Sequence, residues 1–326
     1  MRRNLLATAA VAVAALSLAA CGTTEPTSDA PAAADKPAGK ITLTDDTGVK
    51  VTLDGPAKKV VATEWNVIED LVALGVAPVG VADVKGYTAW NTAAPLTGDP
   101  KDIGTRGEPS IDTVAALAPD LVVATTDLSP AVVKQLRKVA PVIEVTAADA
   151  ADQIGTMNDS IDLIAKATGT ETKADALKKD FEASVAEGKK ALEDAGLGGA
   201  KIASADGYVQ ANQVSIRAYT GGSLLGAVNE RLGLKNAWTV KGDKDYGLAT
   251  TDVEGLTGLG DVQFTYVAND ADGDAFSGLA KNAVWTSLPF VKNGDVHRLP
   301  DGVWMFGGPR SMEAYIDSLV DALTKK

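Results

Sequence analysis

A stretch of 25 residues, 171–195, constrains the fold more than any other part of the sequence. Its hydrophobic residues recur near helical spacing with charged residues between them, at Leu177, Phe181, Val185 and Leu192. Gly196 follows as an end signal. A helix of this length extends roughly 37 Å, about the width of a small domain, because each residue rises ~1.5 Å. The sequence therefore predicts one long, rigid helix in the middle of the chain.

The segments on either side of this helix show the same order of elements. Three segments before it predict strand–helix–strand, helix–strand and helix–strand, at 60–82, 108–125 and 128–145. Three segments after it predict a similar order, at 202–234, 250–268 and 276–299. Residue identity between the halves is low, so the similarity is one of pattern rather than a proven repeat. We expect an α/β fold of two Rossmann-like lobes, 40–170 and 196–326, joined by the helix at 171–195.

The first 20 residues have the features of a secretory signal peptide. Arg2 and Arg3 precede an apolar stretch at 5–18 that is too short to span a membrane comfortably. The sequence LAACG at 18–22 resembles the lipobox of bacterial lipoproteins, which implies cleavage before Cys21 and lipidation of that residue. The alternative is an ordinary secretory signal with an incidental cysteine. Cys21 is the only cysteine in the sequence, so no disulfide can form within the chain.

Residues 21–39 are predicted to be a flexible tether. From residue 23 this stretch lacks large apolar side chains and contains Pro, Ser and Asp, so it cannot form a core. A hairpin is predicted at 41–53, with its turn around DDTG at 45–48. Together with lipidated Cys21, the tether predicts a protein anchored by lipid to the extracytoplasmic face of the cell membrane.

Composition argues against several classes of function. The net charge of −12 makes nucleic acid an unsuitable partner. One histidine and one cysteine are too few for most protein-held zinc or manganese sites, so we expect no metal site and no cofactor. His297 lies in a short alternating stretch that predicts a structural role in a strand; the alternative is a contact with a ligand. No P-loop or G-x-S-x-G motif occurs in the sequence, and no catalytic residue is proposed.

Arginines and aromatic residues at predicted loops are the candidate ligand-binding residues. The arginines are Arg106, Arg217 and Arg310. The aromatic residues at strand ends or turns are Trp65, Tyr87, Trp90, Tyr219, Tyr246 and Trp304. Loops beyond strand ends bind ligands in α/β sheets, guanidinium groups suit anionic oxygens, and aromatic rings form rigid apolar walls. These residues favour an oxygen-rich chelate as ligand; the alternative is that each arginine is a solvated surface charge.

Five motifs together resemble the ferric-siderophore-binding lipoproteins of ABC importers. They are EWNVIEDL at 64–71, GTRGEPS at 104–110, APDLV at 118–122, LGLKNAW at 232–238 and VWMFGGP at 303–309. The resemblance extends from about residue 40 to the C-terminus. It implies a ligand cleft between two lobes, a single long helix joining them, and modest closure on the ligand. It also implies delivery to a membrane permease rather than catalysis, and we expect a monomer.

The resemblance assigns roles to individual residues by position. Arg106 and Arg217 match arginines that face the chelate. The positions that fall in ligand-facing loops are Trp65, Tyr87, Trp90, Tyr246 and Trp304. Arg310 departs from the family pattern, in which an apolar residue is common after Gly-Gly-Pro, and is either an additional ligand contact or a surface residue.

Two acidic residues match positions at which this family contacts its permease. They are Asp112 and Glu254, one in each lobe, and they would meet arginines of the transporter. Each is predicted to open a helix, with Ser110 as the first cap and the TDVE sequence at 251–254 as a capping box. Helix capping alone is the alternative explanation for both acids.

The expected ligand is a ferric siderophore of the hydroxamate type. Neutral ferric trihydroxamates require aromatic walls and few arginines, whereas a triply negative catecholate would be better served by a larger basic cluster. The alternatives are a cobalamin- or haem-binding protein of the same fold, a cell-envelope lipoprotein enzyme, and a purely structural lipoprotein.

Overall fold

The computed structural model describes residues 39–211 and 213–325. The predicted signal peptide, Cys21 and all of the predicted tether but its last residue lie outside these described residues. The described residues form one compact unit.

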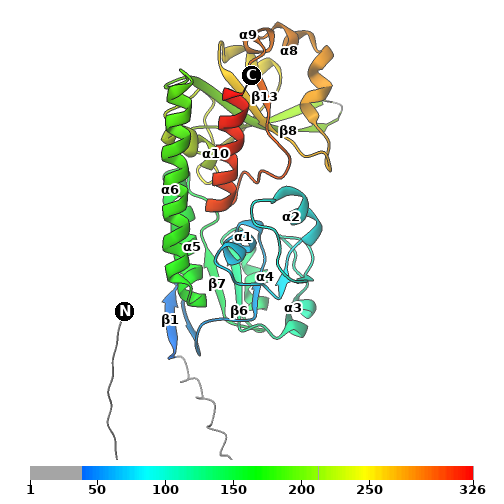
Figure 1. Ribbon diagram of the computed structural model, residues 1–326. Coiled ribbons are helices and arrows are strands. Elements are labelled where there is room, and N and C mark those ends of the chain that lie inside the picture. Colours follow the sequence, from blue (N-terminus) through cyan, green and yellow to red (C-terminus); the bar gives the residue numbers. More distant parts are fainter. Residues whose placement is uncertain (1–38, 212, 326) are drawn as a thin grey trace, which may run out of the picture. The chain divides into compact units, whose positions relative to one another are not determined.

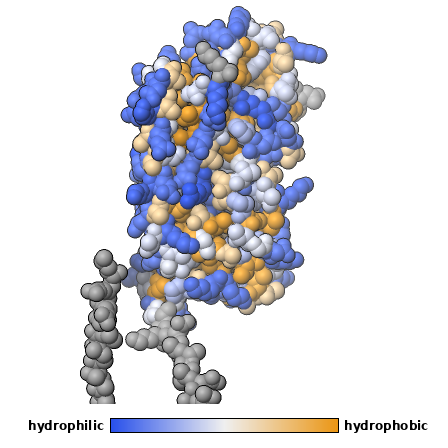
Figure 2. Space-filling view, viewed as in Figure 1, coloured by the Kyte–Doolittle hydropathy of each residue, from blue (hydrophilic) through white to orange (hydrophobic). Residues whose placement is uncertain are grey.

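The long helix α6 (Glu171–Asp194) connects two lobes, each built on its own sheet (Figure 1). Its bounds agree with the predicted helix to within one residue. The predicted apolar residues are buried: Leu177, Phe181, Val185 and Leu192. On this side α6 packs against α5 (Gln153–Thr168) and α10 (Pro309–Thr324). The charged residues of α6 face outward and make much of the hydrophilic surface on its side of Figure 2.

The N-terminal lobe contains a parallel sheet with the strand order β5-β4-β3-β6-β7. Its strands are β3 (Val60–Ala62), β4 (Gly80–Val81), β5 (Lys101–Asp102), β6 (Leu121–Thr125) and β7 (Val142–Val145). The helices of this lobe are α1 (Trp65–Ala73), α2 (Val84–Trp90), α3 (Ile111–Leu117), α4 (Pro130–Leu136) and α5 (Gln153–Thr168). β3, β4, β6 and β7 are buried throughout, as expected for a parallel sheet covered on both faces.

The predicted hairpin at 41–53 is present as β1 (Ile41–Thr44) and β2 (Lys50–Leu53). Asp45 stabilises its turn because one carboxylate oxygen accepts hydrogen bonds from the N–H groups of Thr47 and Val49, at 3.1 and 2.9 Å. The N–H of Asp46 donates to the carbonyl of Glu144, at 3.1 Å, which attaches the hairpin to β7.

The C-terminal lobe contains a mixed sheet with the order β11-β9-β8-β12-β13, and β10 pairs with β8 off this path. Its strands are β8 (Lys201–Gln210), β9 (Gln213–Tyr219), β10 (Lys235–Asn236), β11 (Leu248–Thr251), β12 (Gln263–Val267) and β13 (Val296–Arg298). β8, β12 and β13 are parallel, as a Rossmann-like lobe requires, but β9 is antiparallel to β8 and to β11. β9 begins only three positions after β8 ends, and so short a connection can join only antiparallel strands.

Most helices of the C-terminal lobe are short, with five to eight residues, and α10 is the exception. The helices are α7 (Leu224–Arg231), η1 (Glu254–Gly258), η2 (Ala275–Lys281), α8 (Ala283–Ser287), α9 (Pro289–Asn293) and α10 (Pro309–Thr324). The helix predicted near 250–258 is only the 3-10 turn η1. Thr251 ends β11 instead of capping a helix, and Asp252 accepts the hydrogen bond from the N–H of Gly255, at 3.0 Å. The capping box expected at 251–254 is therefore not formed.

One hydrophobic core continues through both lobes along α6. It contains buried residues of α1 and α5 on one side and of α7 and α10 on the other. Two further clusters, one in each lobe, lie between a face of the sheet and the helices packed on it. None of the helices in the described part of the chain combines the length and the apolar character that a membrane span requires.

Candidate functional site

A cavity of about 830 Å³ lies between the two lobes. Its lining residues follow the carboxyl ends of the parallel strands: Trp65 follows β3, Arg106 follows β5, and Ala268 follows β12. Asp206 lies in β8 beside the end of β12. Ligands of α/β sheets bind at this edge of the strands. The cavity is therefore where the topology of both lobes places a binding site.

Aromatic side chains form a continuous wall of this cavity. Trp304 is central, with ring-centre distances of 4.7 Å to Trp65, 6.2 Å to Trp90 and 5.2 Å to Phe306. Tyr246 contacts Phe306 at 5.6 Å. Trp65 and Trp90 belong to the N-terminal lobe and the other three to the C-terminal lobe, so the wall crosses from one lobe to the other.

The indole N–H groups of Trp65 and Trp304 are buried, and neither finds an acceptor among the described residues. An unmade hydrogen bond of a buried donor costs free energy. Both nitrogens are shielded from the cavity, so in this arrangement they contribute a cost to the wall rather than donors to a ligand.

Arg106 lies against the aromatic wall from the N-terminal lobe. Its guanidinium is 4.1 Å from the ring centre of Trp65 and 5.6 Å from that of Trp304. Its Nη1 donates to Glu64 Oε1 at 2.9 Å. Both side chains of this pair remain partly exposed to the cavity. The guanidinium is held by a cation–π contact and one carboxylate, and its remaining N–H groups can reach a ligand.

Arg217 occupies the corresponding place in the C-terminal lobe, on β9. It forms a two-pronged ion pair with Asp206 of β8, in which Nε donates to Oδ1 at 2.9 Å and Nη2 donates to Oδ2. The hydroxyl of Tyr219 also donates to Asp206 Oδ2, at 3.2 Å. The guanidinium is 5.2 Å from the ring centre of Phe306. Arg217 is thus rigidly oriented toward the cavity by a nearly buried carboxylate.

Two hydrogen bonds made by side chains of the cavity lining connect the two lobes. Trp90 Nε1 donates to Asp272 Oδ2 at 2.7 Å, and the hydroxyl of Tyr246 donates to Asp127. Burial, followed by the hydrogen bond to Asp127, raises the pKa of Tyr246, so its hydroxyl keeps its proton at neutral pH. The tip of the β8–β9 hairpin adds exposed apolar surface to the cavity, since Tyr208 is 50% and Val209 63% exposed.

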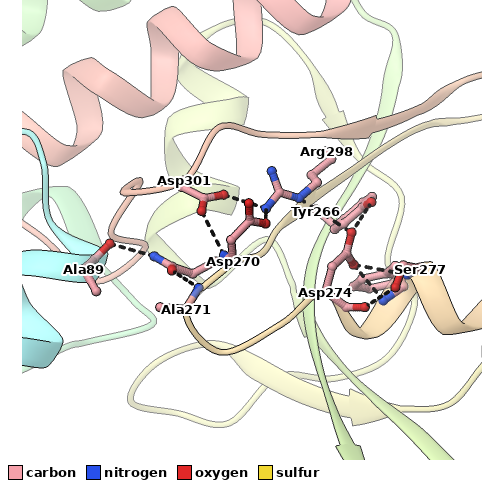
Figure 3. A network of polar contacts seen from close by, with 10 residues as sticks. Ala89, Tyr266, Asp270, Ala271, Asp274, Ser277, Arg298 and Asp301 are labelled. Atoms are coloured by element: carbon pink, nitrogen blue, oxygen red, sulfur yellow. Dashed lines mark hydrogen bonds and ion pairs between the residues drawn. The ribbon is translucent and has the colours of Figure 1, made fainter.

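An acidic loop at 269–274 forms one edge of the cavity. Figure 3 shows the polar contacts that hold this loop. Asn269 Nδ2 donates to the carbonyl of Ala89 at 2.6 Å, which ties the loop to α2. Arg298 donates to Asp270 at 2.7 Å and to Asp301 at 2.5 Å, and its Nε lies 3.6 Å from Asp274. Asp274 accepts further hydrogen bonds from the hydroxyl of Tyr266 and from the start of η2. The loop is therefore fixed by Arg298 and by contacts with the other lobe.

The structure brings together six of the eight residues expected to contact a ligand: Trp65, Trp90, Arg106, Arg217, Tyr246 and Trp304. Tyr87 is not among the lining residues. It is fully buried in α2, and its hydroxyl donates to the carbonyl of Ala94 at 2.6 Å, so it packs in the core instead of facing the ligand. Arg310 also lies elsewhere, at the start of α10, where it pairs with Glu313 at 2.7 Å and Asp180 at 3.4 Å.

Sequence reasoning did not single out the carboxylates Glu64, Asp206 and Asp272 or the ring of Phe306 as cavity residues. Asp206 had a usable signal, because it ends the apolar run IASA at 202–205 and a polar residue after a buried strand lies at the binding edge. Phe306 lies inside the VWMFGGP motif. The sequence does not mark Asp272 as a cavity residue, because an acidic loop that lines a cavity has the same composition as an acidic loop exposed to solvent.

The remaining candidates lie away from the cavity. Asp112 is exposed in the first turn of α3, where the side chain of Ser110 accepts from the N–H of Thr113. Glu254 is exposed at the start of η1. His297 is half-buried on β13 and hydrogen bonds to Gln263 at 2.8 Å, as a structural residue would. Within residues 39–211 and 213–325, no group of three or more His, Cys, Asp and Glu side chains is arranged to hold a metal ion.

Comparison with known proteins connects this geometry to a family. Residues 60–302 match the family described as periplasmic binding protein. The Fe(3+)-citrate-binding protein YfmC of Bacillus subtilis is 29% identical over 282 residues, covering 85% of this chain and 83% of the relative. The iron(3+)-hydroxamate-binding protein FhuD of Escherichia coli is 24% identical over 269 residues, covering 82% and 88%. The solved structure of the siderophore-binding protein FhuD from Vibrio cholerae, with Fe3+-Desferal bound, matches with a TM-score of 0.74 at 26% identity, covering 82% of this chain and 98% of that one.

Proposed function

Because the chain belongs to the periplasmic binding protein family, we propose that it captures a ferric siderophore of the hydroxamate type and delivers it to the permease of an ABC importer. The main support for this proposal is the cavity of about 830 Å³, with its aromatic wall and one arginine from each lobe. The relative named for binding iron(3+)-hydroxamate supports the ligand type, and the relative named for binding Fe(3+)-citrate supports only the capture of a ferric chelate.

The chemistry of the cavity suits a ferric trihydroxamate. Three singly charged hydroxamates balance Fe3+, so the core of such a complex is neutral and bulky, with oxygens at its surface. The rings of Trp65, Trp90 and Trp304 offer flat apolar area, and Arg106 and Arg217 offer N–H donors to the oxygens. The two lobes, 40–170 and 196–326, would close modestly around the ligand while the helix at 171–195 keeps them connected.

In this proposal the protein binds and carries, and it does not catalyse a reaction. Iron enters already chelated by the siderophore, so the protein needs neither metal ligands nor a cofactor of its own. The ferric complex is cargo, released unchanged to the permease.

The sequence supports a location at the outer side of the membrane. Lipidation of Cys21 would anchor a monomer to the extracytoplasmic face of the cell membrane, and residues 21–39 would let the binding lobes turn toward the permease. The test is labelling with a radioactive fatty acid, which we expect for the unaltered chain and not for Cys21→Ala.

Asp112 and Glu254 are the proposed contacts with the permease. Both carboxylates are exposed, one in each lobe, and could meet arginines of the transporter. Charge reversal by Asp112→Lys or Glu254→Lys should reduce transport into cells while leaving ligand affinity unchanged. A loss of affinity instead would contradict this role.

The proposed function is tested by isothermal titration of the full chain in detergent with four ligands: a neutral ferric trihydroxamate, a ferric tricatecholate, haem and cobalamin. We expect saturable binding of the trihydroxamate, weakened at least about ten-fold by Arg106→Ala or Arg217→Ala, because each removes charged hydrogen-bond donors from the cavity. Arg310→Ala is the matched control, since it removes an arginine outside the cavity lining. Binding of haem or cobalamin alone would overturn the choice of substrate, and binding of none would overturn the function.

A further inference from the structure

We propose that the cavity selects ferric chelates by their charge, and that Asp272 binds a cationic group of the ligand. The preferred ligand would be a ferric trihydroxamate that carries an ammonium group. This inference rests on the proposed function and names the charge class of its substrate.

The cavity itself carries a net negative charge. Its lining contains four carboxylates, on Glu64, Asp206, Asp272 and Asp274, and the only cationic side chains among its described lining residues are Arg106 and Arg217. Two negative charges are therefore left over. The net charge stays negative when the nearby Arg298 is included, because that arginine also forms ion pairs with Asp270 and Asp301.

Both guanidinium groups of the cavity are already paired with carboxylates. Arg106 donates to Glu64, and Arg217 makes its two-pronged contact with Asp206. An anionic ligand would have to compete with these carboxylates and would meet their charge at close range. Like charges brought together in a cleft of reduced dielectric repel strongly, which disfavours a tricatecholate complex with three negative charges.

One carboxylate of the lining, that of Asp272, has no cationic partner among the described residues. Asp274 lies 3.6 Å from Arg298 and caps η2, and Glu64 and Asp206 are bound to arginines. Asp272 differs from them. Its Oδ2 accepts from Trp90, its Oδ1 accepts nothing from the described residues, and no described cation forms an ion pair with it.

The position of Asp272 suits an ammonium group at the end of a ligand. The residue is exposed at the cavity edge, and its partner Trp90 belongs to the aromatic wall. A ferric trihydroxamate core resting on that wall could extend an ammonium-bearing arm to the free carboxylate oxygen. The complex would then carry one positive charge, opposite to that of the cavity.

The experiment compares two ligands that differ only in this charge. Ferric desferrioxamine B carries a terminal ammonium, and its N-acetylated form has the same ferric trihydroxamate core without that charge. Isothermal titration of the full chain in detergent measures both, because the contact between Trp90 and Asp272 would complicate a fluorescence signal. We expect the ammonium form to bind about five-fold more tightly at low salt, as for a partly exposed ion pair, with the advantage shrinking in 1 M NaCl.

Asp272→Asn should remove the preference for the ammonium form, and Asp99→Asn, an exposed residue outside the cavity lining, should keep it. Asp272→Asn could also weaken the contact with Trp90 across the cleft, but that change would affect both ligands equally. The ratio of the two affinities therefore isolates the charge. Ferric citrate, which is anionic, should bind at least ten-fold more weakly than either trihydroxamate.

Equal affinity for the two desferrioxamine forms, or a preference that Asp272→Asn leaves intact, would overturn this inference while the proposed function stands. Tighter binding of ferric citrate would also overturn it. If no ferric chelate binds, the proposed function itself fails.

Discussion

Glu69 in α1 caps the N-terminus of α10 through Ser311, a residue 242 positions later in the chain. The carboxylate accepts from the backbone N–H of Ser311 at 2.8 Å and from its hydroxyl at 2.5 Å. The residue at the cap position of α10 is Gly308, which offers no side chain. Glu69 is fully buried and also accepts from Asn91 at 2.7 Å. A carboxylate of the N-terminal lobe thus satisfies a helix end that packs against α6.

Glu69→Ala should lower the free energy of unfolding by about 3 kcal/mol, because it leaves buried donors of Ser311 and Asn91 without an acceptor. Urea denaturation measures the change. Glu69→Gln keeps one acceptor oxygen and should cost less, about 1–2 kcal/mol. A loss below about 0.5 kcal/mol for the alanine variant would contradict the capping role.

Asp70→Asn should stabilise the protein at neutral pH. Burial, together with the charge of Glu69, raises the pKa of Asp70 well above its usual value, and Asp70 Oδ1 has no hydrogen-bond partner among the described residues. The folded state therefore holds the proton more tightly than the unfolded state. The stability that this proton provides is fully present below the pKa of the unfolded chain and is lost as pH rises toward the pKa of the folded state.

The stabilising effect of Asp70→Asn should consequently grow with pH. We expect little difference from the unaltered protein near pH 4 and a gain of about 1–3 kcal/mol near pH 7.5, measured by urea denaturation at both values. Asp99→Asn provides the control for loss of a charge at the surface. A gain that is the same at both pH values would show that Asp70 is not a buried, protonated carboxyl.

Arg217→Ala should lower stability as well as ligand binding. The side chain of Asp206 is only 8% exposed, and removal of the arginine leaves its charge without a cation, at a cost of about 2 kcal/mol. The double variant Arg217→Ala/Asp206→Asn should recover most of this stability without recovering ligand affinity. Recovery of both would mean that Arg217 acts only as a structural partner of Asp206.

Gly188→Ala should destabilise the contact between α6 and α10. Alanine favours a helix over glycine by about 1 kcal/mol. A Cβ at this position, however, would lie 2.6 Å from Ile316 Cγ2 and 2.9 Å from Leu232 Cδ2. Overpacking of this kind costs about 1–3 kcal/mol, so we expect a net loss in thermal denaturation. In an Ile316→Ala background the same change should cost less, and an equal cost in both would exclude the contact with Ile316 as its cause.

The sequence was most informative where one pattern extends over many residues. The apolar spacing from Leu177 to Leu192 holds through several turns, and it predicted the bounds of α6 to within a residue. The strand–helix order predicted the parallel sheet of the N-terminal lobe. In the C-terminal lobe the same order could not reveal that β9 runs antiparallel, because pairing direction depends on the connection and not on periodicity.

The site was predictable only in part, for a related reason. Motif resemblance placed Arg106 and Arg217 at the cavity, but their partners Glu64 and Asp206 depend on contacts between distant segments. Tyr87 follows a turn in the sequence and was expected to face a ligand, yet packing of α2 buries it. In the sequence Glu69 is one polar residue of a predicted helix. Its burial depends on the packing of α10, which follows more than 200 residues later in the chain.

A ferric trihydroxamate should bind in the cavity between the lobes. Crystals of the protein grown with such a complex, measured at the iron absorption edge, would locate the metal directly. We expect one strong anomalous peak inside the cavity bounded by Trp65, Arg217 and Tyr246. It should lie beyond bonding distance of any side chain, because the siderophore supplies the ligands. A peak coordinated directly by protein side chains, or located outside this cavity, would contradict it.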